Sequence, residues 1–584
     1  MKWPSLNRIR EATTQTLFRF PLEIFCALSG TTLLLWQIEQ DNPQDQVLRL
    51  ILCAVLGLAL FLSLTVMAES YAFSKQKRAI AQTLGVLLLV LCWFILAPIE
   101  TETSIIRYSF LLVAFHLLVS FAPKTTIETF WEYNKQLFLR ILTAGLYSGV
   151  LYIGLCIAIA STDFLFDLDL DSKIYLRLFV VIAGIFNTVF FLAGVPNRFE
   201  SLQQDYPKGL KIFTQYVLIP LATIYLAIIL LYEGKVILEW SLPKGIISWL
   251  ILGYAVYGIL SILLVHPVRH SEGNNWIKNY SRLFYILMVP LLPLLCLAII
   301  VRIQSYGITE LRYVVLVLAA WLTGVTLYFL FSKQQNIKVI PFSLAILALL
   351  SAWGPQSASS ISESSQRNRL IKLFDSQGSW RDNKLQPMPA NITDSVGNET
   401  INQLRFMTER YGAASLSTIL PQNINDSIAK KDTIKNKYTR RYAGTELLRK
   451  ELGLKSYYSK NKNNYIEYYQ GSTATVDFAI EGYTRIFSIS WYNQSTEGSS
   501  IKQINDTLRI QIEDKVYEAN LSAIYKNIEL LEDVESRNNM EADQLMLNIG
   551  QEGKAAKLVI RQINYEKDTV ERKLNNLQGF LLRK

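Results

Sequence analysis

The stretch VLRLILCAVLGLALFLSLTVM at residues 47–67 contains one charged side chain, Arg49, and is otherwise almost entirely apolar. A helix needs about 20 such residues to cross the roughly 30 Å hydrocarbon layer of a bilayer, so this stretch predicts a membrane-spanning helix. Comparable stretches precede and follow it. Eleven spans are predicted in all, at 17–37, 47–67, 79–98, 104–122, 137–160, 177–195, 210–232, 245–265, 282–301, 311–331 and 338–355.

The composition divides the chain into a membrane-embedded part and a water-soluble part. Of its 584 residues 51% are hydrophobic and 18% are charged, which is below the roughly 25% charged residues of ordinary soluble chains. The deficit lies in residues 1–356, whereas the remainder has normal polarity. We therefore predict a transmembrane helical domain at 1–356, a Ser-rich exit linker at 357–370 and a soluble domain at 371–584.

Basic and acidic loops mostly alternate along the first part, and the exceptions, Lys173, Lys235 and Lys244, lie in loops that also carry acids. The N-terminus carries Lys2 and Arg8, the loop after the first span has Glu39 and Asp41 with no Lys or Arg, and Lys75 lies in the next loop. The positive-inside rule then predicts a cytoplasmic N-terminus, and eleven spans place the C-terminal domain outside the cytoplasm. The same bias accounts for the net charge of +10, so we expect no nucleic-acid partner.

The C-terminal domain has the periodicities of a mixed fold. Short helices are predicted near 369–374, 401–411 and 445–452, and strands at 476–480, 486–491, 508–512, 545–549 and 558–563. In the third strand Leu508, Ile510 and Ile512 share one face. The expected fold class is a polytopic α-helical membrane bundle of about 11 spans followed by an α+β extracytoplasmic domain.

Motifs for catalysis are missing from the sequence. There is no phosphate-binding loop, metalloprotease helix, nucleophile elbow or Cys-x-x-Cys pair. The only histidines are His116, His266 and His270, which excludes a histidine-dependent triad within residues 371–584, although a carboxylate mechanism stays open there. All five cysteines lie in apolar runs. We expect no cofactor and no metal, and the balance is against an enzyme.

Polar residues inside predicted spans are candidates for function because they are costly in lipid. His116, Asn187 and Gln215 would form one cluster if their helices packed together, and such a cluster would serve a ligand or proton path. The alternative is hydrogen bonding between helices, worth about 0.6–2 kcal/mol per bond. Pro290 and Pro293 predict a kinked ninth span, as in many transporters.

Ionisable groups also gather in one loop that the charge pattern assigns to the cytoplasmic face. His266, Arg269, His270 and Glu272 lie within seven residues of one another. They would hold phospholipid head groups or a partner protein. An ordinary positive-inside anchor is the alternative.

Two further segments carry mostly one sign of charge. Asp167, Asp169 and Asp171 alternate with leucines and would bind Ca²⁺, but they lack the glycine and distal glutamate of an EF-hand loop, so a solvated acidic loop is the simpler interpretation. The basic run at 430–441 would contact anionic lipid or would be a solvated helix face.

Seven segments carry a resemblance to a known family. They are FNTVFFLAGVP (186–196), YPKGLKIFTQ (206–215), HPVRHSEG (266–273), SRLFY (281–285), YGITELRY (306–313), WGPQSASSISESSQ (353–366) and INQLRFMTERYGAASL (401–416). In this order they resemble the bacterial integral membrane family named domain of unknown function 4153, common among Bacteroidetes. The resemblance implies a location in the bacterial cytoplasmic membrane and implies no established activity, so no catalytic residues are carried over.

Three functional hypotheses remain. The first is a non-enzymatic envelope sensor or scaffold whose C-terminal domain binds a protein partner or a ligand. The second is a transporter or exporter of a hydrophobic or lipid-linked substrate, and the third is a membrane-embedded transferase that uses extracytoplasmic carboxylates. Beyond the lipid bilayer, the expected partners are an envelope protein or a lipid ligand.

Overall fold

The computed structural model describes most of the chain and divides it into two units. The described residues are 6–40, 44–96, 102–197, 199, 206, 208–239, 246–267, 275–431, 437–454, 465–470, 480, 482–492, 501–512, 515–529, 545–549, 556–567 and 572–584. The first unit comprises Met1–Pro389 and Asn402–Leu452, and the second comprises Ala390–Ile401 and Gly453–Lys584. Each unit is described by itself.

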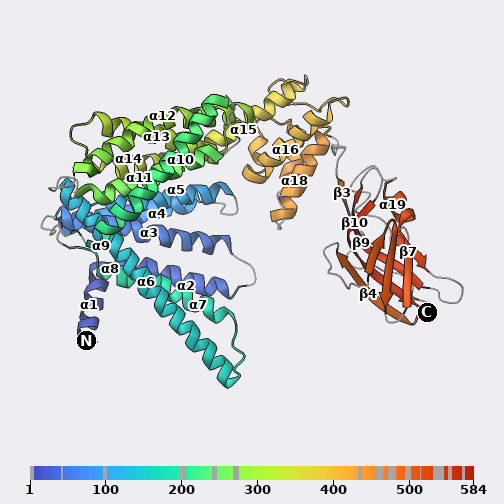
Figure 1. The fold of residues 1–584 in the computed structure, drawn as a ribbon, viewed down its shortest axis with the longest axis horizontal. Coiled ribbons are helices and arrows are strands. Elements are labelled where there is room, and N and C mark those ends of the chain that lie inside the picture. Colours follow the sequence, from blue (N-terminus) through green and yellow to red (C-terminus); the bar gives the residue numbers. More distant parts are fainter. Residues whose placement is uncertain are drawn as a thin grey trace. The chain divides into compact units, whose positions relative to one another are not determined.

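The first unit is helical (Figure 1). Its helices are α1 (Leu6–Arg19), α2 (Pro21–Ile38), α3 (Asp45–Ser70), α4 (Lys75–Ile95), α5 (Glu102–Phe121), α6 (Ile127–Phe166), α7 (Lys173–Val181), α8 (Asn187–Ala193), α9 (Lys208–Phe213), α10 (Ile219–Glu239), α11 (Ile246–Val265), α12 (Asn275–Tyr306), α13 (Glu310–Phe331), α14 (Val339–Ala352), α15 (Ala358–Asp375), α17 (Gln422–Lys431) and α18 (Lys437–Glu451), with α16 (Asp394–Tyr411) shared between the units. Five-residue π-helical segments, η1 (Ile182–Phe186) and η2 (Thr214–Leu218), precede α8 and α10.

Ten helical segments in the described part are long and apolar enough to cross a membrane, and they match the first ten predicted spans. The eleventh predicted span, 338–355, corresponds to α14, which has only 14 residues. Its two ends nevertheless contact opposite ends of neighbouring helices. Phe342 packs against Phe121 at the end of α5, with ring centroids 5.4 Å apart. The Gln356 carbonyl, just beyond α14, accepts a 2.7 Å hydrogen bond from Tyr313 at the start of α13. The short helix therefore extends along the same bundle as its longer neighbours.

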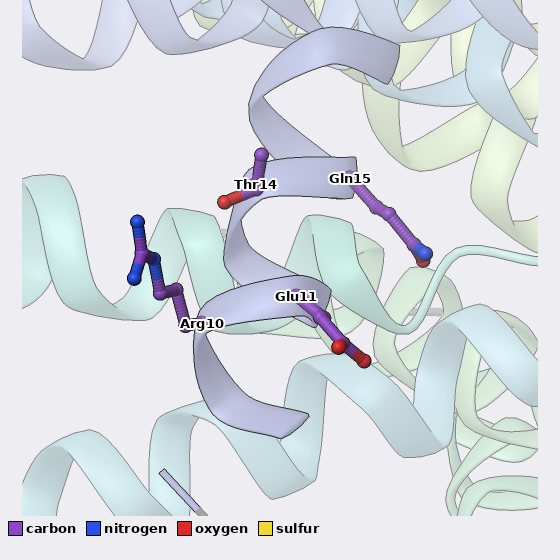
Figure 2. A pocket seen from close by; sticks show the side chains of 4 residues that line it. All are labelled: Arg10, Glu11, Thr14 and Gln15. Atoms are coloured by element: carbon purple, nitrogen blue, oxygen red, sulfur yellow. The ribbon is translucent and has the colours of Figure 1, made fainter. Parts of the chain in front are cut away.

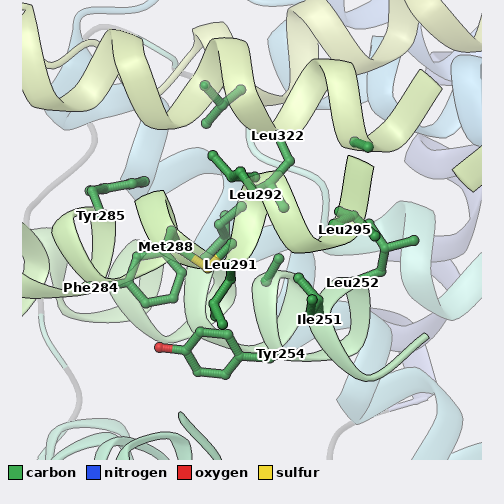
Figure 3. Packing of buried hydrophobic residues seen from close by; sticks show 14 of the residues in the cluster. Ile251, Leu252, Tyr254, Phe284, Tyr285, Met288, Leu291, Leu292, Leu295 and Leu322 are labelled. Atoms are coloured by element: carbon green, nitrogen blue, oxygen red, sulfur yellow. The ribbon is translucent and has the colours of Figure 1, made fainter. Parts of the chain in front are cut away.

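The described residues of the helix bundle form two large hydrophobic clusters. One contains side chains of α10, α11, α12 and α13, and Figure 3 shows residues of the last three of these helices packed within it. The other joins α2, α3, α5 and the first half of α6. In the first cluster α11 and α12 approach closely at Gly258, where a Cβ atom would lie 2.0 Å from the Phe284 ring. Small residues allow such close approach between membrane helices.

The residues predicted as a Ser-rich exit linker, 357–370, lie in helix α15 rather than in an irregular segment. Ser357 caps the helix, because its Oγ accepts a hydrogen bond from the Ser360 amide at 3.3 Å. Ser362, Gln366 and Leu370 then follow at four-residue spacing and are buried. Serine at a cap and on a buried helix face gives the same composition as serine in a linker.

The second unit contains an antiparallel sheet and a three-stranded sheet. Its strands are β3 (Tyr465–Gln470), β4 (Arg485–Tyr492), β5 (Ile501–Ile504), β6 (Thr507–Ile512), β7 (Lys515–Asn520), β8 (Met546–Ile549), β9 (Ala556–Lys567) and β10 (Arg572–Arg583), with helix α19 (Ser522–Glu529). Strand orders are β3-β9-β10-β4, with β8 also paired to β9, and β5-β6-β7. Four predicted strands are confirmed as β4, β6, β8 and β9, and the fifth, 476–480, lies outside the described residues apart from Ile480.

The predicted helices are also present. Residues 369–374 are within α15, 401–411 within α16 and 445–452 overlap α18, which ends shortly before Gly453. Gly453 has φ +69°, a left-handed conformation that favours glycine after a helix. The expected fold class, a membrane helix bundle followed by an α+β region, is therefore confirmed.

Candidate functional site

Three segments that are far apart in the sequence meet at one end of the bundle. They are the start of α13, the first half of α15 and the end of α16, and they belong to the stretches YGITELRY, WGPQSASSISESSQ and INQLRFMTERYGAASL. The start of α5 joins them. The side chains at this meeting point are polar or charged, although the helices of the bundle are apolar, which makes it the most distinctive polar site in the described part of the first unit.

Glu310 is the centre of this site. Its side chain has no exposed surface, and the Arg410 Nε lies 2.9 Å from each of its two carboxylate oxygens. Arg410 also pairs with Glu102, at the start of α5, so one guanidinium bridges two helices of the bundle. We name Glu102, Glu310, Arg410 and Tyr411 the charge lock.

The Tyr411 hydroxyl completes the lock. It lies 2.7 Å from Glu310 Oε1 and 2.6 Å from the Ser362 Oγ on α15. A phenol has one proton, so Tyr411 donates to the carboxylate and accepts from Ser362. Burial, together with the charge of Glu310, raises the pKa of Tyr411 well above its usual range. The hydroxyl therefore stays protonated and remains a hydrogen-bond donor at physiological pH.

Arg410 stays charged because of its carboxylate partners. Burial would lower its pKa, but the hydrogen bond to Glu310 and the charges of Glu310 and Glu102 outweigh burial and raise it. A buried ion pair of this kind adds little net stability, because desolvation offsets the attraction. It does fix which helices meet and in which register, since leaving one partner unpaired is costly.

A second set of contacts holds α15 against the turn between α12 and α13. The Gln366 Nε2 donates to the Tyr306 and Ile308 carbonyls at 3.1 and 2.9 Å, and the Ile308 amide donates to Ser365 Oγ at 2.9 Å. Gln403 of α16 in turn donates to the carbonyl and the side-chain oxygen of Gln366, at 3.0 and 2.9 Å. Hydrogen bonds thus connect α15 to the α12–α13 turn and to α16.

Arg107 makes a third connection. Its Nε and Nη2 donate to the Ser359 Oγ at 3.1 and 3.0 Å, which links α5 to the first turn of α15. Glu310, Glu363 and Tyr411 all lie within electrostatic range of Arg107. Arg107 and Arg410 are therefore surrounded by three acids here, of which Glu363 also pairs with Arg367. The ionised groups are paired with one another, so this arrangement suits mechanical coupling better than acid–base chemistry on a substrate.

The predicted intramembrane cluster is placed as three separate residues. His116 on α5 is exposed on the bundle surface, and its Nδ1 lies 2.8 Å from the Leu112 carbonyl of its own helix. Asn187 accepts a 3.2 Å hydrogen bond from Ser148 on α6. Gln215 is half-buried within η2. Within the described residues no hydrogen bond joins any two of the three side chains His116, Asn187 and Gln215.

The predicted cytoplasmic-face cluster is only partly described. His266 is half-buried at the end of α11, near Glu128 of α6. Arg269, His270 and Glu272 lie outside the described residues. The basic run at 430–441 lies largely outside them too.

A second polar cluster, which the sequence interpretation missed, lies at the end of α1. Arg19 binds both oxygens of Glu69 at 2.9 and 2.7 Å and donates to the Val195 and Pro196 carbonyls at 2.7 Å. These carbonyls end the quoted segment FNTVFFLAGVP. Glu69 and the Val195 and Pro196 carbonyls are 50, 176 and 177 residues from Arg19, so no local sequence pattern indicates these contacts.

The acidic loop makes internal contacts. Asp171 pairs with Arg177 at 2.9 Å and accepts from the Lys173 amide at 2.9 Å. Among the described residues, no group of three or more histidine, cysteine or acidic side chains is arranged to hold a metal ion.

One hollow of about 440 Å³ lies along α1 and is lined by Arg10, Glu11, Thr14 and Gln15. In Figure 2 Arg10 and Thr14 lie on one side of the helix and Glu11 and Gln15 on the other. The four side chains do not converge on a common point, so the hollow offers no built site for a ligand.

Comparison with known proteins gives a family and a distant relative. The family described as "Domain of unknown function (DUF4153)" matches residues 24–370. The chain is also similar to "Uncharacterized protein PM1469" of Pasteurella multocida (strain Pm70), with 26% identity over 344 residues, which is 57% of this chain and 55% of that protein. The chain thus spans about half the length of this curated relative. No solved structure matches it.

Proposed function

The chain belongs to the family described as domain of unknown function (DUF4153), and from this premise we propose that it is a non-enzymatic sensor or scaffold of the bacterial inner membrane. It is a multi-pass membrane-helical protein, and its family has no assigned activity. The observation that carries the proposal is the charge lock. Such a set of ion pairs and hydrogen bonds couples the segment beyond the last membrane span to the helix bundle, so that a change in one alters the other.

The proposed role has two parts. The second unit, with its antiparallel sheets, binds an envelope protein or a ligand on the extracytoplasmic side. The lock and the contacts of Gln366 transmit force or position from α15 and α16 to the starts of α5 and α13. The proposed orientation is supported by the alternation of loop charge and by eleven apolar helices, α14 included.

A crosslinking experiment in cells tests this proposal. The full chain is compared with a chain that ends after Leu454, which keeps every residue of the lock, and captured proteins and lipids are identified by mass spectrometry. The proposal expects a stoichiometric protein partner that is lost with residues 455–584. Equal capture by both chains, or no protein capture by either, would contradict it.

Transport is the second candidate, and one observation favours it. Asn187 directly follows the π-helical segment η1, and Gln215 lies within η2. π-helical turns inside α-helices are frequent at functional sites because they displace backbone groups from the regular ladder. Substitution of both residues, Asn187→Ala with Gln215→Leu, is expected to abolish a cellular phenotype while the protein remains inserted. An unchanged phenotype would remove this candidate.

A further inference from the structure

Three arginines gather where α12 ends and α13 begins. Arg302 is on the last turns of α12, Arg312 is on the first turn of α13, and Arg369 comes from α15. The turn between α12 and α13 contains Gly307, whose φ of +69° is a left-handed conformation that favours glycine. Because Gln366 and Ser365 hold this turn, the position of Arg369 beside it is fixed by the fold.

Arg312 and Arg369 share an acceptor. The Nη1 atoms of both side chains donate to the Tyr306 carbonyl at 3.1 Å, and Arg312 Nη1 also donates to the Gly307 carbonyl at 2.8 Å. Their guanidinium carbons lie 5.5 and 5.6 Å from the centre of the Tyr306 ring. Two guanidinium groups are therefore oriented by the same residue, and Arg312, which carries five N–H groups, has further donors besides the one bound to these carbonyls.

The charges in this cluster have the same sign. Arg302 and Arg369 both lie within electrostatic range of Arg312. Within the described part of the chain, neither Arg302 nor Arg312 forms an ion pair with a carboxylate. Like charges at short range repel one another, and an anion placed among them would remove this repulsion. Guanidinium groups match the geometry of phosphate oxygens.

An apolar surface continues from the arginines along the same two helices. Leu297, Ile300, Val301 and Leu311 are all exposed, by 49%, 45%, 39% and 58%. In a membrane helix such side chains face acyl chains. Tyr306 itself is half exposed, and tyrosine is enriched at the level of lipid head groups. The surface therefore offers arginines at the head-group level and aliphatic side chains below them.

We propose that Arg302, Arg312 and Arg369 bind the phosphate of an anionic phospholipid whose acyl chains lie along α12 and α13. Membrane insertion does not account for these arginines. Arg302 and Arg312 flank the loop between the ninth and tenth spans, which the loop-charge pattern assigns to the side where basic residues are depleted, and Arg369 follows the last span on the same side. The lipid site is separate from the charge lock and does not depend on the scaffold function.

Titration of the full-length protein with lipid in detergent micelles tests the site. Native mass spectrometry counts bound phosphatidylglycerol in the wild type, in Arg302→Gln and in the double variant Arg302→Gln/Arg312→Gln. Arg302 makes no hydrogen bond within the described residues, so its replacement leaves the fold intact. Arg177→Gln is the matched control, because Arg177 is already paired with Glu39 and Asp171.

The expected result is one tightly bound phosphatidylglycerol per chain, with about tenfold weaker binding in Arg302→Gln and a further loss in the double variant. Arg177→Gln binds as the wild type does, and Arg312→Lys, which keeps the charge, binds better than Arg312→Gln. Equal binding of phosphatidylcholine, or unchanged binding in the double variant, would overturn the proposal. Displacement by excess inorganic phosphate would overturn the lipid as the source and point to a free phosphate.

Discussion

Glu310 is a carboxylate with no exposed surface, and Arg410, whose side chain is 16% exposed, is its main counter-charge. Replacement Arg410→Ala would leave Glu310 buried and unpaired. We expect a loss of about 3–5 kcal/mol in unfolding free energy, the usual cost of breaking a buried pair from one side. Thermal unfolding in detergent measures it.

Arg367→Ala is the control for this loss. Arg367 pairs with Glu363 on the same helix, at 3.5 Å and with both side chains partly exposed, so its removal should change stability by less than about 1 kcal/mol. The double variant Glu310→Leu/Arg410→Met should recover most of the stability, because it leaves no uncompensated charge. Similar losses in Arg367→Ala and Arg410→Ala would mean that the lock has no special energetic role.

Tyr525 gives the second unit a pH dependence. Burial, and to a lesser extent the charge of Asp506, raises its pKa, so the folded state favours the neutral phenol. The stability that the folded state gains from the neutral phenol is fully present below the unfolded pKa of about 10 and is lost as the pH rises above that value. The hydroxyl is also buried without a hydrogen-bond partner in the described part of the chain.

Tyr525→Phe should therefore stabilise the second unit by about 1 kcal/mol at neutral pH and by more above pH of about 10. Pulse proteolysis in urea at a series of pH values measures the difference. Parallel stability curves for the wild type and Tyr525→Phe would show that titration of this phenol does not contribute.

At the level of single elements, the contact of α11 with α12 depends on Gly258. Phe284 is 2% exposed, and its ring lies 5.5 Å from that of Tyr254 and 5.1 Å from that of Tyr285, so it has no room to move (Figure 3). Gly258→Ala should cost about 1–3 kcal/mol through overpacking. Gly253 is on the same helix with open space around it, and Gly253→Ala should be neutral or stabilising by up to about 1 kcal/mol. Thermal unfolding of both variants separates the effect of the helix contact from that of helix propensity. Equal changes in stability would contradict the role of Gly258 in this contact.

Elements of this protein differ in how far sequence predicts them. The ten long spans were predictable because hydrocarbon thickness sets a minimum length for an apolar run, and strands such as β6 alternate clearly between faces. The first part of helix α15, before residue 369, was not, because its buried face contains Ser362 and Gln366. Burial of polar side chains leaves no hydrophobic period in the sequence.

The charge lock lay beyond prediction for a different reason. Glu310 and Arg410 are separated by 100 residues, and Glu102 and Arg410 by 308. No local pattern connects residues at such separations, and charged residues near helix ends look the same whether they are solvated or buried. The chosen intramembrane residues His116, Asn187 and Gln215 were recognisable by type alone, and their role stays a prediction.

For the whole molecule, the orientation in the membrane depends on α14. If α14 crosses, the N-terminus and the loop at Lys333 are cytoplasmic and the chain end is outside. An alkaline phosphatase fused after Lys584 should then be active, and the same enzyme inserted at Lys333 should be inactive. An inactive C-terminal fusion would mean that only ten helices cross, and it would move the second unit into the cytoplasm.

The separation of the lock residues along the chain also sets an order of events during synthesis. Glu102 leaves the ribosome 308 residues before its partner Arg410. At about 5–20 residues per second this is a delay of roughly 15–60 s. Through the last 100 residues of that interval Glu310 is already made but lacks its ion-pair partner Arg410. The contacts of Glu310 with Arg410 and Tyr411 are therefore completed only when α16 has been synthesised.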